Sequence, residues 1–409
     1  MRRILIVGAG QSGLQLALGL QTHGYEVTVV SARTPDEVRE GRVMSTQCLF
    51  GTALAHERDL GLDFWEQRAP RIEGVGVSVS GPDATRAVDW VGRLEAAAQS
   101  VDQRVKLAGW MEVFADRGGK LVIATPSAER LDNDAPVHDL TIVAAGRSEL
   151  VSLFPPDPVR SIHRVPQRAL SVCYVNGLQP RPEHPDFHAV RCNLVPGIGE
   201  LFVMPTHTTT GGADILFWEA VPGGPADIFA GIGDPREHLR RTLDLMRRYT
   251  PWEYERARRV ELTDPGGTLS GRLVPTVREP VAELPCGVPV LGMADTVVVN
   301  DPITGQGANN AAKSAAAHLD AIIAHGDAVF DRKWMRAAHD AVRPIVEPAT
   351  KWSNAMLAPP PEHVREILDA AAVHQEVADR FACAFDRPAD LEDWFFDPDK
   401  ARRYLGALA

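Results

Sequence analysis

Apolar and polar residues follow two different patterns along the chain, and the first begins at the N-terminus. Residues 3–7 form a short apolar run, residues 13–22 have helical spacing, and residues 26–30 form a second apolar run. Apolar runs of this length on both sides of a helix are typical of buried parallel strands. The pattern therefore predicts an N-terminal βαβ unit. Apolar runs at 140–144 and 288–292 predict two further strands that end at the same edge.

Alternation of apolar and polar residues marks the middle of the chain. It occurs at residues 74–79, 169–175, 200–204 and 215–221. A period of two predicts strands with one face in a core, so these segments predict a mostly antiparallel sheet inserted into the first domain. From about residue 308 onward the pattern is helical. The sequence thus predicts an α/β fold with a Rossmann-like domain, an inserted β domain and C-terminal helices.

A glycine-rich turn, Gly8-Ala-Gly10-Gln11-Ser12-Gly13, connects the first strand to the first helix. Its spacing is that of G-x-G-x-x-G in the strand–turn–helix context that gives this motif its meaning. The first glycine permits a tight turn, the second lets a pyrophosphate approach the backbone, and the third lets helix and strand pack closely. We call residues 8–13 the first glycine turn. It predicts a dinucleotide site and does not separate FAD from NAD.

The residues after the second strand depart from the usual pattern. An acidic residue normally binds the adenosine ribose at this position, whereas this chain has Ser31 and Arg33. A hydroxyl and a guanidinium hold a ribose diol less tightly than a carboxylate does, and an arginine here also fits the 2'-phosphate of NADP. Both interpretations stay open at this point.

A second glycine-rich turn lies much later in the chain. The strand that ends at Gly292 is followed by Asp295, and then Asp301-Pro302-Ile-Thr-Gly305-Gln306-Gly307-Ala308-Asn309 opens a helix. An aspartate can accept hydrogen bonds from a ribityl hydroxyl, and the amides at a helix N-terminus attract anionic or electron-rich atoms. We call residues 301–309 the second glycine turn. Two such turns in one chain predict a flavin site more specifically than either alone.

With these turns the sequence resembles the flavoprotein monooxygenases of the hydroxylase-like fold, from residue 1 to about residue 405. Members that perform their own NAD(P)H step usually carry an Asp-Gly pair after the middle strand. Here Ala145 replaces that aspartate before Gly146, in the stretch Val143-Ala-Ala145-Gly146-Arg147-Ser148. This departure resembles the styrene and indole monooxygenase branch, in which a separate reductase delivers reduced FAD.

The loop at residues 40–47 supports the same resemblance. It is similar to the family's loop that faces flavin and substrate, and residues 196–201 resemble a hairpin of its substrate sheet. Styrene-type members are expected to have Asn-Thr-Val where this chain has Ser45-Thr46-Gln47. The Ser-x-Gln pattern resembles the indole-type subgroup. Val75, where styrene-type members have histidine, favours the same subgroup.

Individual residues receive roles from this comparison. The catalytic candidates are Ser45, Thr46, Gln47 and Pro302. Besides both glycine turns, the cofactor candidates are Ser31, Arg33, Arg42, Arg104, Ala145, Gly146, Gly292 and Asp295. The substrate-pocket candidates are Ser45, Gln47, Ile72, Val75, Leu201, Val203, Trp218 and Ile303.

Several of these residues fit a second interpretation. Ser45 and Thr46 are hydroxyl residues that could equally cap a turn. Gln47 fits either an acceptor for an indole N–H or a surface amide, and Arg104 fits either a pyrophosphate ligand or a solvated helical arginine. The alternation that places Leu201, Val203 and Trp218 in a pocket is also explained by core packing.

The resemblance implies the oxygenase component of a two-component FAD-dependent monooxygenase. Such a protein takes FADH2 from an NADH-dependent flavin reductase and uses O2 to epoxidise a small aromatic alkene, with indole favoured and styrene as the other option. Three alternatives remain: a single-component NAD(P)H-dependent aromatic hydroxylase, a non-catalytic flavin-binding redox sensor, and a halogenase. The halogenase lacks support because no W-x-W-x-I-P segment is present.

The resemblance also suggests how the chain divides into domains. The predicted segments are 1–50, 86–165 and 285–330 for the FAD-binding domain, 51–85 and 166–284 for the substrate-binding sheet, and 331–409 for the C-terminal helical region.

Composition and charge exclude several other classes. The 409 residues are 44% hydrophobic and 24% charged, which is near the globular average. The net charge of -11 does not favour nucleic acid or an anionic membrane. The five cysteines follow neither a disulfide framework nor a zinc spacing, and no metal is expected. No run reaches the ~20 apolar residues of a membrane span. We therefore expect a cytoplasmic protein, and a homodimer is one assembly left open.

Overall fold

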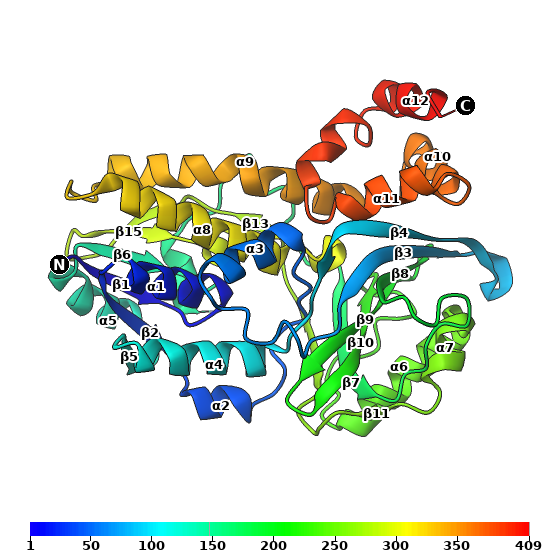
Figure 1. Cartoon of the computed structure of the whole chain (residues 1–409), viewed down its shortest axis with the longest axis horizontal. Helices are drawn as coiled ribbons and strands as arrows, with labels where there is room; N and C mark the ends of the chain where they lie inside the picture. The colour runs from blue at the N-terminus through cyan, green and yellow to red at the C-terminus, as the bar shows by residue number, and fades with distance from the viewer. Residues whose placement is uncertain (147, 409) are drawn as a thin grey trace.

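The computed structural model describes residues 1–146 and 148–408. Within these residues two sheets lie next to each other, and the C-terminal helices extend across both (Figure 1). One sheet is mainly parallel and the other mainly antiparallel. The predicted fold class is thereby confirmed.

The parallel sheet contains the predicted βαβ unit. Its strand order is β14-β15-β6-β1-β2-β5, and every neighbouring pair is parallel except β14 and β15. Ile4 and Ile6 of β1 face one core while Leu5 and Val7 face the opposite core. Burial on both faces explains why this strand is an uninterrupted apolar run. The strands are β1 (Arg3–Val7), β2 (Glu26–Ser31), β5 (Lys120–Ile123), β6 (Leu140–Val143), β14 (Val281–Glu283) and β15 (Pro289–Gly292).

Helices cover both faces of the parallel sheet. One core contains side chains of the helices α1 (Gln11–Thr22), α2 (Pro35–Arg39), α4 (Gln103–Asp116), α8 (Gly307–His325) and α9 (Arg332–Met356). The opposite core contains Leu131 of α5 (Ala128–Asp134). Both faces of the parallel sheet are therefore covered by helices, and only the loops at the strand ends can line a ligand site.

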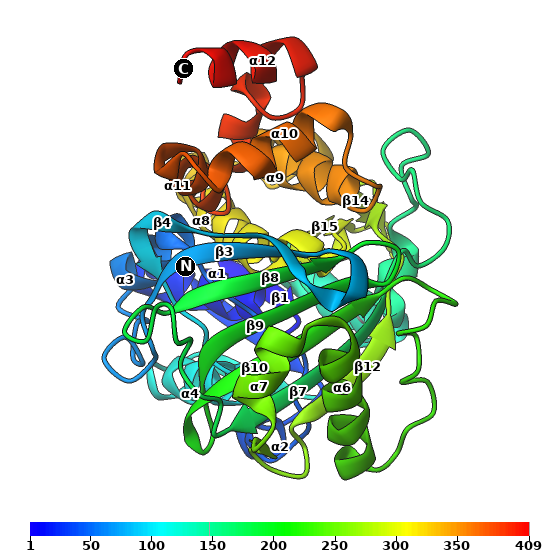
Figure 2. The same ribbon diagram turned by 90° about the vertical axis from the view of Figure 1, so that its right-hand side faces the viewer.

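The second sheet has the strand order β11-β7-β10-β9-β8-β3-β4, with β12 beside β7, and its only parallel pair among the described residues is β3 with β8. Two helices, α6 (Pro235–Tyr249) and α7 (Pro251–Ala257), cover its outer face (Figure 2). The strands are β3 (Ile72–Ser80), β4 (Arg86–Ala98), β7 (Ala169–Asn176), β8 (Ala189–Val195), β9 (Gly199–Thr208), β10 (Gly211–Ala220), β11 (Glu261–Leu262) and β12 (Thr268–Arg272). A short pair, β13 (Thr276–Val277) and β16 (Val298–Val299), lies apart from both sheets.

Two segments pack with a different domain from the one to which the sequence assigned them. β4 pairs along its length with β3, so the prediction that residues 86–98 belong to the FAD-binding domain is wrong. The helix α3 (Gly51–Asp59), predicted within the substrate domain, packs through Ala53 and Leu54 against Ala312 of α8. Strand pairing depends on tertiary contacts that composition does not record, so the hairpin of β3 and β4 carried no boundary signal.

The C-terminal region is helical, as predicted. α9 continues through two prolines to Met356, and it is followed by α10 (Glu362–Ala371), α11 (Gln375–Cys383) and α12 (Pro398–Gly406). α11 lies directly on β4, where a Cβ atom at Gly92 would stand 1.9 Å from the carbonyl oxygen of Ala378. Of the helices in the described residues, none combines the length and apolar character that a membrane span requires.

Candidate active site

A cavity of about 770 Å³ lies between the carboxyl edge of the parallel sheet and the inner face of the second sheet. The turns after β1, β2, β6 and β15 all reach it, which is where ligands bind in open α/β sheets. Its volume is in the range of small-molecule and cofactor sites. The predicted residues that line it are Gly8, Gly10, Gln11, Ser12, Ser31, Arg33, Ser45, Thr46, Gln47, Ala145, Gly146, Asp295, Pro302, Gly305, Gly307 and Ala308.

The three glycines of the first glycine turn are each required for a different physical reason. Gly8 has a φ of 121°, and a Cβ atom there would lie 2.5 Å from the Ala144 carbonyl oxygen. A Cβ atom at Gly13 would lie 2.0 Å from the Gly8 carbonyl oxygen. Gly10 differs, because no described atom lies within 4 Å of a Cβ atom placed there. Protein packing explains Gly8 and Gly13, whereas Gly10 leaves room for a group that belongs to a ligand.

Two helices begin at the cavity with their first amides available. α1 follows Gly10 and α8 follows Gln306, and in the described part of the chain neither of these residues caps its helix with a side-chain hydrogen bond. A helix N-terminus with unpaired amides is an anion-binding position. A Cβ atom at Gly307 would also meet no described atom within 4 Å. Both glycine turns therefore present bare backbone amides to the same cavity.

At the β2 end the cavity is lined by Ser31 and Arg33. The Ser31 hydroxyl already donates to the Arg33 carbonyl oxygen at 2.7 Å, and the Arg33 guanidinium contacts the Met44 sulfur at 2.8 Å. Arg33 is exposed, so its guanidinium is the group of this pair that remains accessible to a ligand. No acidic residue from the end of β2 lines the cavity among the described residues.

The middle of the cavity brings together Ala145, Gly146 and Asp295. Ala145 follows β6 and Asp295 follows β15, which are adjacent strands. A Cβ atom at Gly146 would lie 2.4 Å from the Asp295 Cβ, so a glycine is required at this contact. Gly292 is the last residue of β15 and does not line the cavity. Arg147, which belongs to the same predicted stretch, lies outside the described residues.

The loop that holds Ser45, Thr46 and Gln47 forms one side of the cavity. Gln47 is buried, and its Nε2 donates to the Val101 carbonyl oxygen at 2.6 Å. Because that carbonyl needs a donor, the amide orientation is fixed and Oε1 points elsewhere. Oε1 has no hydrogen-bond partner among the described residues. Ser45 donates its hydroxyl proton to the Thr46 carbonyl oxygen at 2.9 Å, which fits its alternative interpretation as a turn residue.

The side chains of two predicted cofactor residues form hydrogen bonds with the protein backbone. Asn309 donates from Nδ2 to the Cys48 carbonyl oxygen at 2.8 Å and accepts from the Phe50 amide at 2.9 Å. Gln306 donates from Nε2 to the carbonyl oxygens of Thr304 and Phe385, both at 3.0 Å. Neither residue lines the cavity. They tie the second glycine turn to the 45–50 loop and to the C-terminal region.

Three predicted pocket residues lie on the face of the second sheet that points away from the cavity. Leu201, Val203 and Trp218 belong to the core between this sheet and α6 and α7. The residues of β8, β9 and β10 that line the cavity are Val190, Phe202, Met204 and Phe217. The alternation itself was correct, but both faces of this sheet are covered, and a period of two does not tell which face meets the ligand.

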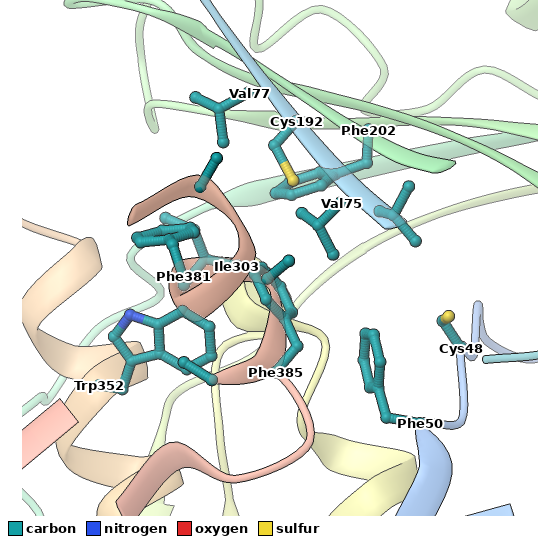
Figure 3. Close-up of a cluster of buried hydrophobic side chains, with 14 of the residues drawn as sticks. Cys48, Phe50, Val75, Val77, Cys192, Phe202, Ile303, Trp352, Phe381 and Phe385 are labelled. Atoms are coloured by element: carbon teal, nitrogen blue, oxygen red, sulfur yellow. The ribbon is translucent and has the colours of Figure 1, made fainter. Parts of the chain in front are cut away.

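Ile72, Val75 and Ile303 lie behind the cavity wall. All three are buried in the core that the second sheet forms with the C-terminal helices, and none lines the cavity. Figure 3 shows Val75 and Ile303 in this core. The wall itself contains two aromatic pairs. The ring centroids of Phe50 and Phe385 are 5.5 Å apart, and those of Phe202 and Phe217 are 5.8 Å apart. Sequence reasoning missed Phe385, because the helical pattern around it carries no signal for a ligand site.

Arg42 and Arg104 do not line the cavity. Arg42 is exposed. Arg104 is buried, and its guanidinium binds Asp102 at 2.8 Å and Asp264 at 2.9 Å. Burial alone would lower the pKa of Arg104, but hydrogen bonds to Asp264 and Asp102 outweigh it and raise the pKa. Arg104 therefore holds α4 to the loop at Asp264, and its predicted role at the pyrophosphate finds no support in this geometry.

This ion cluster predicts a large effect on stability. Replacing Arg104 with methionine leaves the buried Asp102 carboxylate without its cation, so we expect a loss of about 3–5 kcal/mol in the free energy of unfolding. Arg58→Met is the matched control, because the Arg58–Glu66 pair is partly exposed and a pair of this kind contributes about 0–1 kcal/mol. Urea unfolding measures the free energy of unfolding of both variants. An Arg104→Met variant that loses no more than the control would contradict the buried-cluster interpretation.

Comparison with known proteins identifies the family. The chain is 31% identical over 418 residues to a protein named styrene monooxygenase StyA from Pseudomonas sp, and the alignment covers 100% of this chain and 98% of that protein. It is 30% identical to a styrene monooxygenase StyA from Pseudomonas fluorescens with the same coverage. The chain belongs to the styrene monooxygenase StyA family. Residues 146–256 also match the family model "Styrene monooxygenase A putative substrate binding domain".

The expectation of an FAD-dependent monooxygenase of the styrene monooxygenase type is therefore confirmed. Among solved structures, a triple mutant of the flavin-dependent brominase Bmp2 has a TM-score of 0.66 and 15% identity, with 98% of each chain covered. At that identity the likeness supports the fold alone. The styrene monooxygenase family implies FAD, and the open space at Gly10 and Gly307 with two uncapped helix N-termini fits such a cofactor.

Proposed function

We propose that this styrene monooxygenase family member is the oxygenase component of a two-component system. It takes FADH2 from a separate NADH-dependent flavin reductase and epoxidises a small aromatic alkene with O2, and indole is preferred over styrene. The family membership supports the reaction type. The preference for indole rests on the geometry of Gln47.

Four groups of residues fit FAD in the cavity. The first turn of α1 beside Gly10 would bind the pyrophosphate, and Arg33 would lie at the adenosine end. Asp295 would bind the ribityl chain, and the second glycine turn would present its amides to the isoalloxazine. When bound, FAD supplies the redox chemistry that activates O2 and delivers one oxygen atom to the substrate.

The cavity wall opposite these residues is apolar and aromatic. The pairs Phe50–Phe385 and Phe202–Phe217 offer flat surfaces to an aromatic ring. Val190 and Met204 complete this wall. Such a wall excludes water from the reacting atoms and orients a planar substrate by packing. A small aromatic alkene matches this chemistry.

The proposed preference for indole rests on the amide oxygen of Gln47, which has no hydrogen-bond partner among the described residues. Gln47 lines the cavity, its Oε1 is buried without a partner among the described residues, and its Nε2 donates to the Val101 carbonyl oxygen. An unpaired buried acceptor costs free energy that a ligand donor recovers. Indole has an N–H that can donate to this oxygen, whereas styrene has no donor. Oε1 therefore favours indole.

A competition assay tests the proposed function. The protein, a flavin reductase, NADH and O2 are supplied with equal concentrations of indole and styrene, and both oxygenated products are quantified. We expect oxygenation of both compounds with the larger kcat/KM for indole. Equal or greater kcat/KM for styrene would contradict the indole preference, and no oxygenation of any aromatic alkene despite FAD binding would favour the redox sensor.

Reduction by NADH alone distinguishes the two-component system from a single-component hydroxylase. Ala145 lines the cavity where single-component enzymes are expected to carry an aspartate. Without a group that holds the nicotinamide in position, hydride transfer should be slower by on the order of a hundredfold or more. We expect NADH to leave the absorbance of bound FAD unchanged over a turnover time and chemically reduced FAD to support oxygenation. Rapid bleaching without reductase would contradict the two-component system.

A further inference from the structure

A buried ion pair lies beside the first glycine turn and outside the cavity. Glu57 of α3 and Lys106 of α4 are each 3% exposed, and the Lys106 Nζ donates to the Glu57 Oε1 at 2.6 Å. Neither residue lines the cavity. Moving two charges out of water costs free energy, and apolar residues of similar volume often stabilise a fold equally well. Stability alone is therefore a weak reason for this pair.

Glu57 is hydrogen-bonded to the first glycine turn through Gln11. The Gln11 Nε2 donates to the Glu57 Oε1 at 2.9 Å and to the Gln15 Oε1 at 3.1 Å. Gln11 is the first residue of α1, it is buried, and it lines the cavity. An amide nitrogen carries two hydrogens, so both are used by these two acceptors. The orientation of the Gln11 side chain is thereby fixed.

The hydrogen bonds continue from Gln15 to the helix that follows the second glycine turn. The Gln15 Nε2 donates to the carbonyl oxygen of Ala312 in α8 at 3.0 Å. Glu57, Gln11 and Gln15 are all buried, and together they connect α3 to α1 and α1 to α8. These last two helices are the ones that begin at the cavity. The Glu57 carboxylate therefore supports a side chain of the cavity wall without lining the cavity itself.

We propose that Glu57 is a positioning residue for FAD, which holds the Gln11 side chain in one orientation while Lys106 balances the charge of the carboxylate. Gln11 directly follows Gly10, so the proposal rests on the proposed FAD site. A glutamine side chain loses much rotamer freedom when it is ordered, and ordering such a side chain at the moment of binding lowers affinity. Glu57 orders it before FAD binds and contacts neither cofactor nor substrate.

Two double variants separate this role from the contribution of the ion pair to folding. Replacing one partner alone would leave a buried charge unpaired, whereas replacing both removes the two charges together. Glu57→Leu with Lys106→Met removes the acceptor for Gln11. Glu57→Gln with Lys106→Met removes the same charges and keeps a side-chain oxygen that accepts from the Gln11 Nε2. The variant with glutamine is therefore the matched control for the variant with leucine.

Equilibrium binding of oxidised FAD is measured by fluorescence, and thermal unfolding without FAD shows whether each variant is folded. We expect the Kd of the leucine variant to be roughly three- to tenfold above the wild type, and that of the glutamine variant to stay within about twofold. Equal Kd values for the two double variants would overturn the proposal, because the acceptor at position 57 would then have no effect. Failure of only the leucine variant to fold would also contradict it, since the acceptor would then serve the fold.

Gln11→Met tests whether Glu57 acts through Gln11. This variant leaves the pair of Glu57 and Lys106 in place and should raise the Kd for FAD by about the same factor. Adding Glu57→Leu and Lys106→Met to it should raise the Kd no further, because changes that remove the same contact are not additive. A further rise as large as in the wild-type background, or an unchanged Kd for Gln11→Met, would contradict the proposal.

The outcomes also separate this role from the proposed function. None of these measurements involves turnover, so they are independent of the substrate assignment. A wild-type protein that binds no FAD would contradict the proposed FAD site and, with it, this role of Glu57. FAD binding that is equal in all variants would contradict the role of Glu57 alone.

Discussion

A Gly10→Val variant is expected to fold and to bind FAD at least about a hundredfold more weakly than the wild type. Gly10 has a φ of -89° and a ψ of -173°, a conformation open to any residue, and no described atom lies within 4 Å of its Cβ position. The side chain would occupy the space in which the pyrophosphate meets the first amides of α1. Loss of two hydrogen bonds to a charged group costs roughly 3–6 kcal/mol, which corresponds to about a hundredfold or more in Kd.

Gly212→Val is the control for this prediction. Gly212 also has an open Cβ position without a positive φ, but it lies at the start of β10 and does not line the cavity. Titration of oxidised FAD by fluorescence gives both Kd values, and thermal unfolding without FAD checks that both variants are folded. If Gly10→Val retained wild-type affinity, the first glycine turn would not be the pyrophosphate site.

Both glycine turns could be predicted from the sequence because each follows from local chemistry. A strand, a glycine turn and a helix are adjacent in sequence, and the N-terminal amides of the helix point toward the ligand position whatever the rest of the chain does. Gly8, Gly10, Gly305 and Gly307, which the sequence predicts as cofactor residues, all line the cavity. The alternating segments also became the strands of the second sheet.

The errors concern the choice between two equivalent environments. Leu201 and Phe202 are neighbours on β9 that face opposite cores, and both cores are apolar. Only the positions of α6 and α7 decide which face meets the ligand. Arg104 could serve a phosphate or an ion pair, and its partner Asp264 is far away in sequence. Phe385 reaches the cavity because Gln306 binds its carbonyl oxygen, a contact between distant segments.

Replacing Gln47 with valine, alone and with Ser45→Asn, is expected to shift the preference from indole toward styrene. The variant removes the buried Oε1 that would accept the indole N–H and offers an apolar surface to a vinyl group. Loss of a buried polar partner typically costs ~1–3 kcal/mol, so the ratio of kcat/KM for indole over styrene should fall by roughly 5- to 150-fold. Competition assays with reductase-supplied FADH2 measure this ratio.

Gln99→Val separates this effect from general destabilisation. Gln99 is also buried, and its Nε2 donates to the Glu66 carbonyl oxygen at 2.8 Å in the way that Gln47 donates to Val101. Gln99 does not line the main cavity. Its loss should therefore lower stability without changing the ratio. If the double variant kept its ratio within about twofold of the wild type, Oε1 of Gln47 would not face the substrate. In that case the indole preference would have no structural basis, although the apolar cavity would still fit a small aromatic alkene.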